Sequence, residues 1–209
     1  AYNYRGNLLA ARIAEIIGED PKPYANEAAA ILKAMNETLW IDDEGHWAEY
    51  KDLMGLKRLH KNAALWTIYT PIDCGACSAS PTGVVLNQLF TFPTTTWMPY
   101  DWSTNNVAHE EVANMALAYF QAGRDDDGFL LLKSDLIDGQ YLGVSPGNFG
   151  QISYYDKARS EAYRDFADNV GITSRALVNG LFGILPVDSS GVVLALPKHS
   201  VHWFGRSFD

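Results

Sequence analysis

The sequence predicts an all-α fold, built from helical hairpins, that ends in a β segment. Apolar residues recur at helical spacing along most of the chain, the first two such stretches are joined by a short link, and residues 192–196 form a strand-like run near the end. We therefore expect helical hairpins over residues 1–186 and the start of a β segment over residues 187–209.

The first two helices form a hairpin. Residues 6–18 place Leu9, Ile13, Ile16 and Ile17 on one face and end in Gly18, a common residue just after a helix. After a turn that contains two prolines, apolar residues from position 24 to 39 keep the same spacing. Residues 39–52 then alternate loosely around an Asp-Glu-Gly turn, which indicates a short strand-like excursion.

Four further helices are expected. A third helix near 53–69 carries His60 as a core or rim residue, and a long connection over 71–105 holds four prolines. A helix over about 106–121 should bury four apolar residues, namely Val112, Met115, Ala116 and Tyr119. Another helix follows the acidic triplet 125–127, and the last spans about 173–184, where Gly180 and Gly183 allow close packing.

Composition and charge narrow the possible partners. The chain has 209 residues, 47% of them hydrophobic and 12% aromatic, which is enough for a real core. Its formal net charge of -9 argues against nucleic acids and anionic membranes, which need clustered Lys and Arg. No apolar run is long enough to span a bilayer. We therefore expect a neutral substrate, no nucleic acid and no membrane as partners.

The two cysteines form one Cys-x-x-Cys, at Cys74 and Cys77. In redox enzymes this spacing lies at a helix N-terminus after a strand, whereas here it follows a helix and leads into a loop. One pair is also only half of a four-ligand zinc site. A local disulfide or two bystander thiols is the preferred interpretation, and a dithiol enzyme is a third, weaker hypothesis for the function.

The stretch from Trp97 to Glu111 has the composition of a sugar-binding loop. Aromatic rings can stack on the apolar face of a pyranose, and amide side chains can bind its hydroxyls. The expected binding residues here are Trp97, Tyr100, Trp102, Asn105 and Asn106. The plain alternative is that the rings are core residues and the asparagines are helix caps.

Acidic residues beside aromatic residues occur in two other places. Glu49 and Asp52 are flanked by Trp47 and Tyr50, and a second group, Glu161, Asp165 and Asp168, follows Tyr154 and Tyr155. Two carboxylates suffice for glycoside hydrolysis: one protonates the leaving oxygen and the other activates water or attacks the sugar. Taken singly, each acid is more often a solvated surface group.

Five stretches together resemble a known group of proteins: Gly45–Asp52, Trp97–Asn106, Pro146–Gly150, Tyr163–Asp168 and Arg175–Ile184. They are similar to an uncharacterised bacterial family of six-hairpin glycosidase-like proteins and, more distantly, to the inverting α-L-fucosidases. The resemblance implies an (α/α)6 toroid whose inter-helix loops bind a glycan, and a periplasmic or extracellular location. The acid that precedes Gly-Asn-Phe-Gly in fucosidases is Pro146 here and is not carried over.

The first hypothesis is a glycoside hydrolase, or part of one, that uses an inverting two-carboxylate mechanism without metal or cofactor. Glu49 is the expected general acid and Asp165 the expected base, with Glu161, Asp168 and Asp52 as substitutes, and Trp47 joins the sugar-binding residues. The alternative is a non-catalytic carbohydrate-binding or assembly module. The chain is expected to contain roughly half of the helices of a toroid. Either other domains of a longer parent protein supply the rest, or the chain is a remodelled half toroid.

Overall fold

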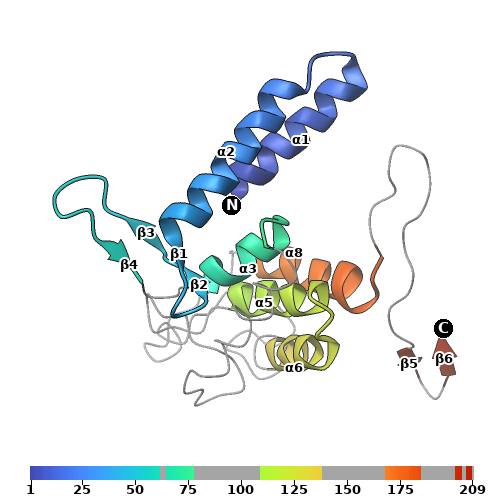
Figure 1. The fold of residues 1–209 in the computed structure, drawn as a ribbon. Coiled ribbons are helices and arrows are strands. Elements are labelled where there is room, and N and C mark those ends of the chain that lie inside the picture. The colour runs from blue at the N-terminus through green and yellow to red at the C-terminus, as the bar shows by residue number, and fades with distance from the viewer. Residues whose placement is uncertain (62–64, 78–108, 138–167, 185–200, 204–205, 209) are drawn as a thin grey trace. The chain divides into compact units, whose positions relative to one another are not determined.

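The computed structural model describes residues 1–61, 65–77, 109–137, 168–184, 201–203 and 206–208 (Figure 1). The chain divides into two compact units: the described residues up to Cys77 belong to unit 1 and those from His109 onward to unit 2. The described residues are mostly helical, with a few short two-stranded sheets. This confirms the predicted fold class at the level of mainly helical structure. None of the described helices has the length and apolar content needed to span a bilayer.

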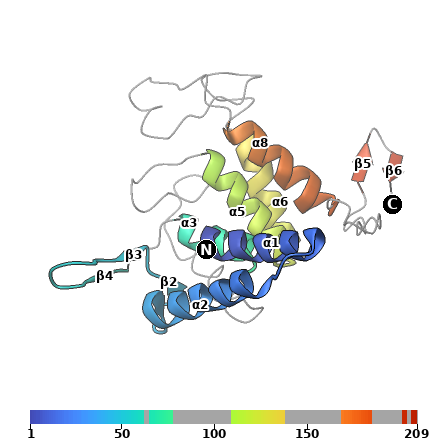
Figure 2. The same cartoon turned by 90° about the horizontal axis from the view of Figure 1, so that it is seen from above.

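Unit 1 begins with the predicted helical hairpin. Helix α1 spans Tyr2–Ile17 and helix α2 spans Lys22–Leu39. Gly18 ends α1 in the left-handed conformation, with φ of 80°, and its N–H is directed at the carbonyls of Ala14 and Glu15. The two helices lie side by side (Figures 1 and 2). Their buried residues are small, namely Ala11, Ala14 and Ala28, so the backbones approach closely.

The large apolar residues of α1 lie on its exposed side. The four residues that share a face in the sequence, Leu9, Ile13, Ile16 and Ile17, are 46–67% exposed. The helical spacing correctly predicted the helix, but alanines rather than these residues pack against α2.

A β-hairpin follows α2, as predicted. Strands β1 (Trp40–Ile41) and β2 (His46–Trp47) pair antiparallel with Trp40 opposite Trp47. The turn between them is closed by the N–H of Gly45, which donates to the carbonyl of Ile41 at 2.7 Å. Gly45 has φ of 72°, a conformation that favours glycine.

The predicted third helix over 53–69 is wrong. Strands β3 (Tyr50–Lys51) and β4 (Leu59–His60) form a second antiparallel ribbon joined by the loop of residues 52–58. Gly55 and Lys57 have φ of 66° and 49°, which no right-handed helix accommodates. His60 therefore lies on a strand and not on a helix.

Helix α3 spans Leu65–Asp73 and is largely buried. It begins well after the predicted start of the third helix and continues through Pro71, where the long connection was expected to begin. A proline removes one backbone hydrogen bond but does not stop a helix that is held by packing on several sides. The residues of the connection from 78 to 105 lie outside the described residues.

Unit 2 contains helices α5 (His109–Gln121), α6 (Asp125–Asp135) and α8 (Asp168–Arg175), and α8 continues as the π-helix η2 (Ala176–Leu181). The predicted core face of α5 is confirmed, because its four residues Val112, Met115, Ala116 and Tyr119 are fully buried. Burial raises the pKa of Tyr119. The hydroxyl of Thr173 donates to buried Asp135 at 3.0 Å and joins α8 to α6.

Phe120 lies between two glycines of unit 2. A Cβ at Gly128 would meet its ring at 2.9 Å, and a Cβ at Gly180 would meet it at 2.6 Å. The predicted close approach at Gly180 is thus confirmed. Gly183 instead has φ of 66° just after η2.

The C-terminal residues form a third two-stranded ribbon. Strands β5 (Val201–Trp203) and β6 (Arg206–Phe208) pair antiparallel with His202 opposite Ser207. The predicted strand over 192–196 and the predicted boundary between residues 186 and 187 lie outside the described residues.

Candidate functional site

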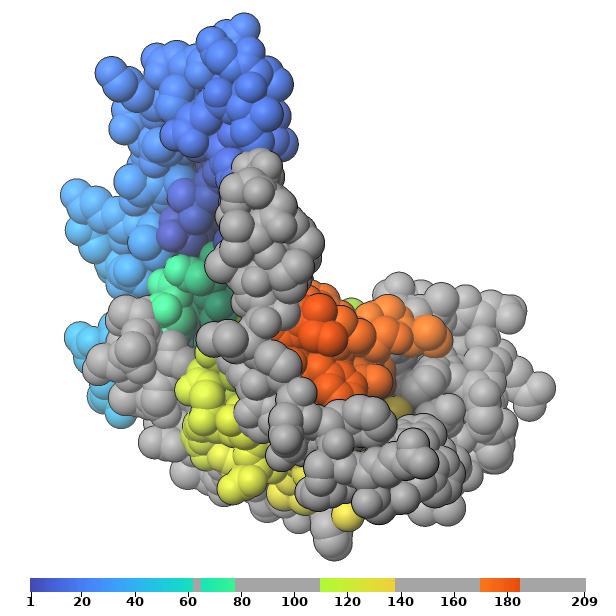
Figure 3. Space-filling model, turned by 90° about the vertical axis from the view of Figure 1, so that its right-hand side faces the viewer, coloured from blue at the N-terminus to red at the C-terminus, as the bar shows by residue number. Residues whose placement is uncertain are grey.

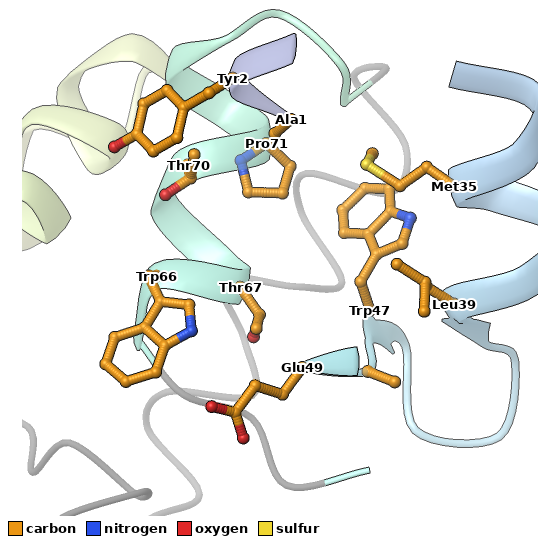
Figure 4. A pocket seen from close by; sticks show the side chains of 11 residues that line it. Ala1, Tyr2, Met35, Leu39, Trp47, Glu49, Trp66, Thr67, Thr70 and Pro71 are labelled. Carbon is orange, nitrogen blue, oxygen red and sulfur yellow. The ribbon is translucent and has the colours of Figure 1, made fainter. Parts of the chain in front are cut away.

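Unit 1 contains a cavity of about 260 Å³ whose walls are mainly apolar and aromatic (Figure 4). Three structural elements and the N-terminus supply the lining: α2, the segment from β2 to Glu49, and α3. The cavity is lined by Ala1, Tyr2, Met35, Leu39, Trp47, Ala48, Glu49, Trp66, Thr67, Thr70 and Pro71. Glu49 is the only charged side chain among them.

The β1–β2 hairpin fixes the position of Trp47. The indole of Trp47 meets that of Trp40 edge to face, with ring centroids 4.7 Å apart, and its N–H donates to the amide oxygen of Asn36 at 3.2 Å. Trp47 is only 4% exposed. It therefore forms a fixed part of the wall, with its polar edge already occupied by a side chain of α2.

His46 holds the turn of the same hairpin. Its Nδ1 lies 3.0 Å from the carbonyl oxygen of Trp47, and its Nε2 lies 3.0 Å from a carboxylate oxygen of Glu44. Both partners are acceptors, so both contacts are hydrogen bonds only when each ring nitrogen carries a proton. His46 is buried and engaged on both sides, which gives it a structural role beside Trp47.

Glu49 combines a fixed backbone with a carboxylate that has no protein partner in the described part of the chain. Its N–H donates to the carbonyl of His60 at 2.9 Å, which ties Glu49 to strand β4. Its carboxylate makes no hydrogen bond or ion pair with the described residues and lies at the edge of the cavity, on the side of Trp66 and Thr67 (Figure 4). Glu49 also lines a second, larger cavity of about 690 Å³.

Thr70 adds a second polar group that lacks a partner. It is 7% exposed, and its hydroxyl has no hydrogen-bond partner among the residues that the structure describes. A buried hydroxyl without a partner costs about 1–3 kcal/mol, so such groups call for an explanation. Since Thr70 lines the cavity, a bound ligand could supply the missing partner.

Asp52 is in a different situation from Glu49. Its carboxylate lies 2.9 Å from Nε2 of His60, and the His60 ring stacks on Tyr50 with centroids 3.9 Å apart. Arg58 lies 4.0 Å away. Asp52 does not line the cavity around Trp47. Its carboxylate therefore orients His60, and this partner makes it a weaker candidate for acid catalysis than Glu49.

The structure brings two of the residues singled out in the sequence, Trp47 and Glu49, into one cavity. Asp168 is the first residue of α8, in unit 2, and its side chain is outside the described part. The remaining predicted site residues lie outside the described residues: Trp97, Tyr100, Trp102, Asn105, Asn106, Glu161 and Asp165. Their roles stay predictions.

Sequence reasoning missed the other lining residues, among them Tyr2, Trp66 and Thr70. Trp66 and Thr70 stand one helical turn apart on α3, in a segment that reads as plain apolar helix. The available signal was Trp66 itself, because an indole offers a large apolar face together with one hydrogen-bond donor.

Cys74 and Cys77 follow α3 and are not joined in a disulfide. They stand past the C-terminal end of the helix, which is opposite to the end whose dipole favours a thiolate. Among the described residues, no three His, Cys, Asp or Glu side chains are grouped to hold a metal ion.

No protein-family model matches this chain, and no curated protein shows significant sequence similarity to it.

Proposed function

We propose that this chain is a glycoside hydrolase, or part of one, and that the cavity of unit 1 binds a sugar. The observation that supports this most is the set of groups that line this cavity: two indoles, and a hydroxyl and a carboxylate that have no partner among the described residues. A sugar offers an apolar ring face to Trp47 or Trp66 and hydroxyls to Thr70 and Glu49.

In this proposal Glu49 is the general acid and protonates the leaving glycosidic oxygen. Glu49 is the charged side chain among the residues that line this mainly apolar cavity, and this position favours it for the role. Asp165 is the proposed base that activates water, with Glu161, Asp168 and Asp52 as substitutes. Inversion requires the two carboxyl groups to lie about 6.5–9.5 Å apart, and retention about 5–5.5 Å.

The wider setting is proposed from the sequence resemblance. The helices would belong to an (α/α)6 toroid, completed by other residues or by other domains of a longer protein, and the enzyme would act on a glycan in the periplasm or outside the cell. Trp97, Tyr100, Trp102, Asn105 and Asn106 would extend the sugar-binding surface. No cofactor is required by this chemistry.

The test of sugar binding combines a glycan panel with substitution of Trp66. On the best ligand, Trp66→Ala should weaken binding about thirtyfold, which corresponds to about 2 kcal/mol for a lost aromatic contact. The matched control is Phe129→Ala, because Phe129 is a half-exposed aromatic residue of α6 in the other unit. Equal binding by both variants, or no glycan bound by the parent, would contradict the proposal.

A non-catalytic carbohydrate-binding or assembly module is the second candidate. A small cavity beside buried Trp47 is equally compatible with a protein that binds a sugar and does not cleave it. Release of reducing ends by the parent protein separates the two candidates: a binding module retains the glycan and releases none.

A further inference from the structure

The second cavity of unit 1 borders the one around Trp47 and is more than twice its size. Its volume is about 690 Å³, against about 260 Å³ for the first cavity, and it is within the range of about 300–1,000 Å³ that small-molecule sites have. The start of α1, the second half of α2 and residues of the segment from Glu49 to Leu53 line it. In Figure 3 the start of α1, in the darkest blue, lies against the lighter blue end of α2.

The two cavities share part of their lining, and Glu49 belongs to both. The shared residues are Ala1, Tyr2, Met35, Leu39 and Glu49. Glu49 is the one among these five whose side chain is charged, and its carboxylate has no hydrogen bond or ion pair with the described residues. Because the shared residues make the cavities neighbours, a chain-like ligand that occupies both of them passes Glu49.

The second cavity contains an aromatic ring that its neighbours hold in place. Tyr50 lines this cavity and is 48% exposed. One face of its ring stacks on His60, with the ring centroids 3.9 Å apart and the planes at 17°, and Asp52 holds Nε2 of His60 at 2.9 Å. His60 leaves the other face of the Tyr50 ring uncovered, and an aromatic face of this kind can stack on the apolar face of a pyranose. Tyr50 is therefore a preformed stacking surface for a sugar.

Polar side chains complete the lining of the second cavity. The amide of Asn3, the hydroxyl of Thr38 and the ammonium group of Lys51 have no partner in the part of the chain that the structure describes. Each of these groups can donate a hydrogen bond to a sugar hydroxyl. The charged side chains of this lining, Glu49 and Lys51, have opposite signs, which favours a ligand without net charge. A few polar groups among apolar and aromatic ones are the usual composition of a small-molecule site.

We propose that the second cavity binds the next sugar residues of the same glycan, so that the ligand is a neutral oligosaccharide or polysaccharide chain that runs past Glu49 from one cavity into the other. This inference rests on the proposed function, because it takes the first cavity as the site of one sugar residue. The second cavity has more than twice that volume, which leaves room for more than one further residue. The glycosidic bond beside Glu49 then has a bound sugar residue on each side.

Calorimetric titration with a series of chain lengths tests this inference. The ligands are the monosaccharide, disaccharide and trisaccharide of the glycan that the parent binds best, and all proteins carry Glu49→Gln so that the chains stay intact. Affinity should rise at least tenfold from the monosaccharide to the trisaccharide. Tyr50→Ala should weaken trisaccharide binding about tenfold and leave monosaccharide binding unchanged, and Tyr50→Phe should restore it because the ring is kept. Trp66→Ala should weaken the binding of both ligands.

Asn3→Ala is a second variant of the same cavity, and it lies on α1 rather than on the β3–β4 ribbon. It should weaken trisaccharide binding about threefold to tenfold, so the test does not depend on the ribbon that carries Tyr50.

The matched control is Tyr24→Ala, because Tyr24 is 43% exposed on α2 and lines neither cavity. It should bind every ligand like the parent, and circular dichroism should show all variants folded. A trisaccharide bound no more tightly than the monosaccharide would overturn this inference, and so would Tyr50→Ala and Asn3→Ala variants that bind like the control. The first cavity would then remain the sugar site if Trp66→Ala still weakens binding. Equal binding by Trp66→Ala and the control would contradict the proposed function as well.

Discussion

Replacement of Thr70 by valine should stabilise the protein and weaken ligand binding at the same time. Valine keeps the shape of threonine and removes the hydroxyl, which is buried and has no partner in the described part of the chain. The desolvation cost of such a group is about 1–3 kcal/mol, so Thr70→Val should raise the free energy of unfolding by an amount within that range. Helix propensity changes little, because both residues are β-branched.

The assay is urea denaturation of both proteins without ligand, followed by binding of the best glycan from the panel. The matched control is Thr173→Val, which removes a hydroxyl that donates to buried Asp135 at 3.0 Å. That variant should lose about 1.5–3 kcal/mol of stability, because it deprives a buried carboxylate of a donor. Glycan affinity should fall up to about tenfold for Thr70→Val and stay unchanged for Thr173→Val.

Loss of stability in Thr70→Val would refute the reasoning, because it would show that the hydroxyl is hydrogen-bonded in the unliganded protein. A gain of stability with unchanged glycan affinity would refute only the second part. Thr70 would then be an orphaned group with no role in binding.

Two further predictions concern the core of unit 2. Gly180→Ala should destabilise the protein by about 1–3 kcal/mol, because the new Cβ would lie 2.6 Å from the ring of Phe120. Gly171→Ala should stabilise the protein by about 0.5–1 kcal/mol, because nothing lies within 4 Å of a Cβ at that position. Equal effects in urea denaturation would contradict this packing. Burial raises the pKa of Tyr119, so the native state keeps a proton that the unfolded chain releases above about pH 10. Above that pH the free energy of unfolding should fall as the pH rises, by up to about 1.4 kcal/mol per pH unit. Tyr119→Phe should lessen that slope, and an unchanged slope would contradict the assignment.

Helical spacing correctly predicted the elements whose apolar residues keep that spacing over several turns. The α1–α2 hairpin and the buried face of α5 are of this kind. The prediction of a helix was wrong at residues 53–59, where leucine occurs at every third position by coincidence, at Leu53, Leu56 and Leu59. The left-handed residues Gly55 and Lys57 decide the backbone there, and a lysine gives no sequence signal for positive φ.

Part of the candidate site could also be predicted. The sequence predicts Trp47 and Glu49 as site residues, because an acid stands close to an indole in a short strand segment. The β1–β2 hairpin holds this segment in place, and both residues line the same cavity. Trp66 and Thr70 escaped notice because they come from a helix that is distant in sequence and apolar in composition. The convergence of α2, β2 and α3 is a tertiary effect that local patterns do not contain.

The most direct test of the account is the release of reducing ends by the parent protein and by Glu49→Gln, on the glycan that the parent binds best. The amide keeps the size of the carboxylate but cannot act as a proton donor to the leaving oxygen. The account predicts that Glu49→Gln binds the glycan with affinity close to that of the parent and loses at least about a hundredfold in hydrolysis. Hydrolysis at the parental rate by Glu49→Gln would contradict the claim that Glu49 is the general acid.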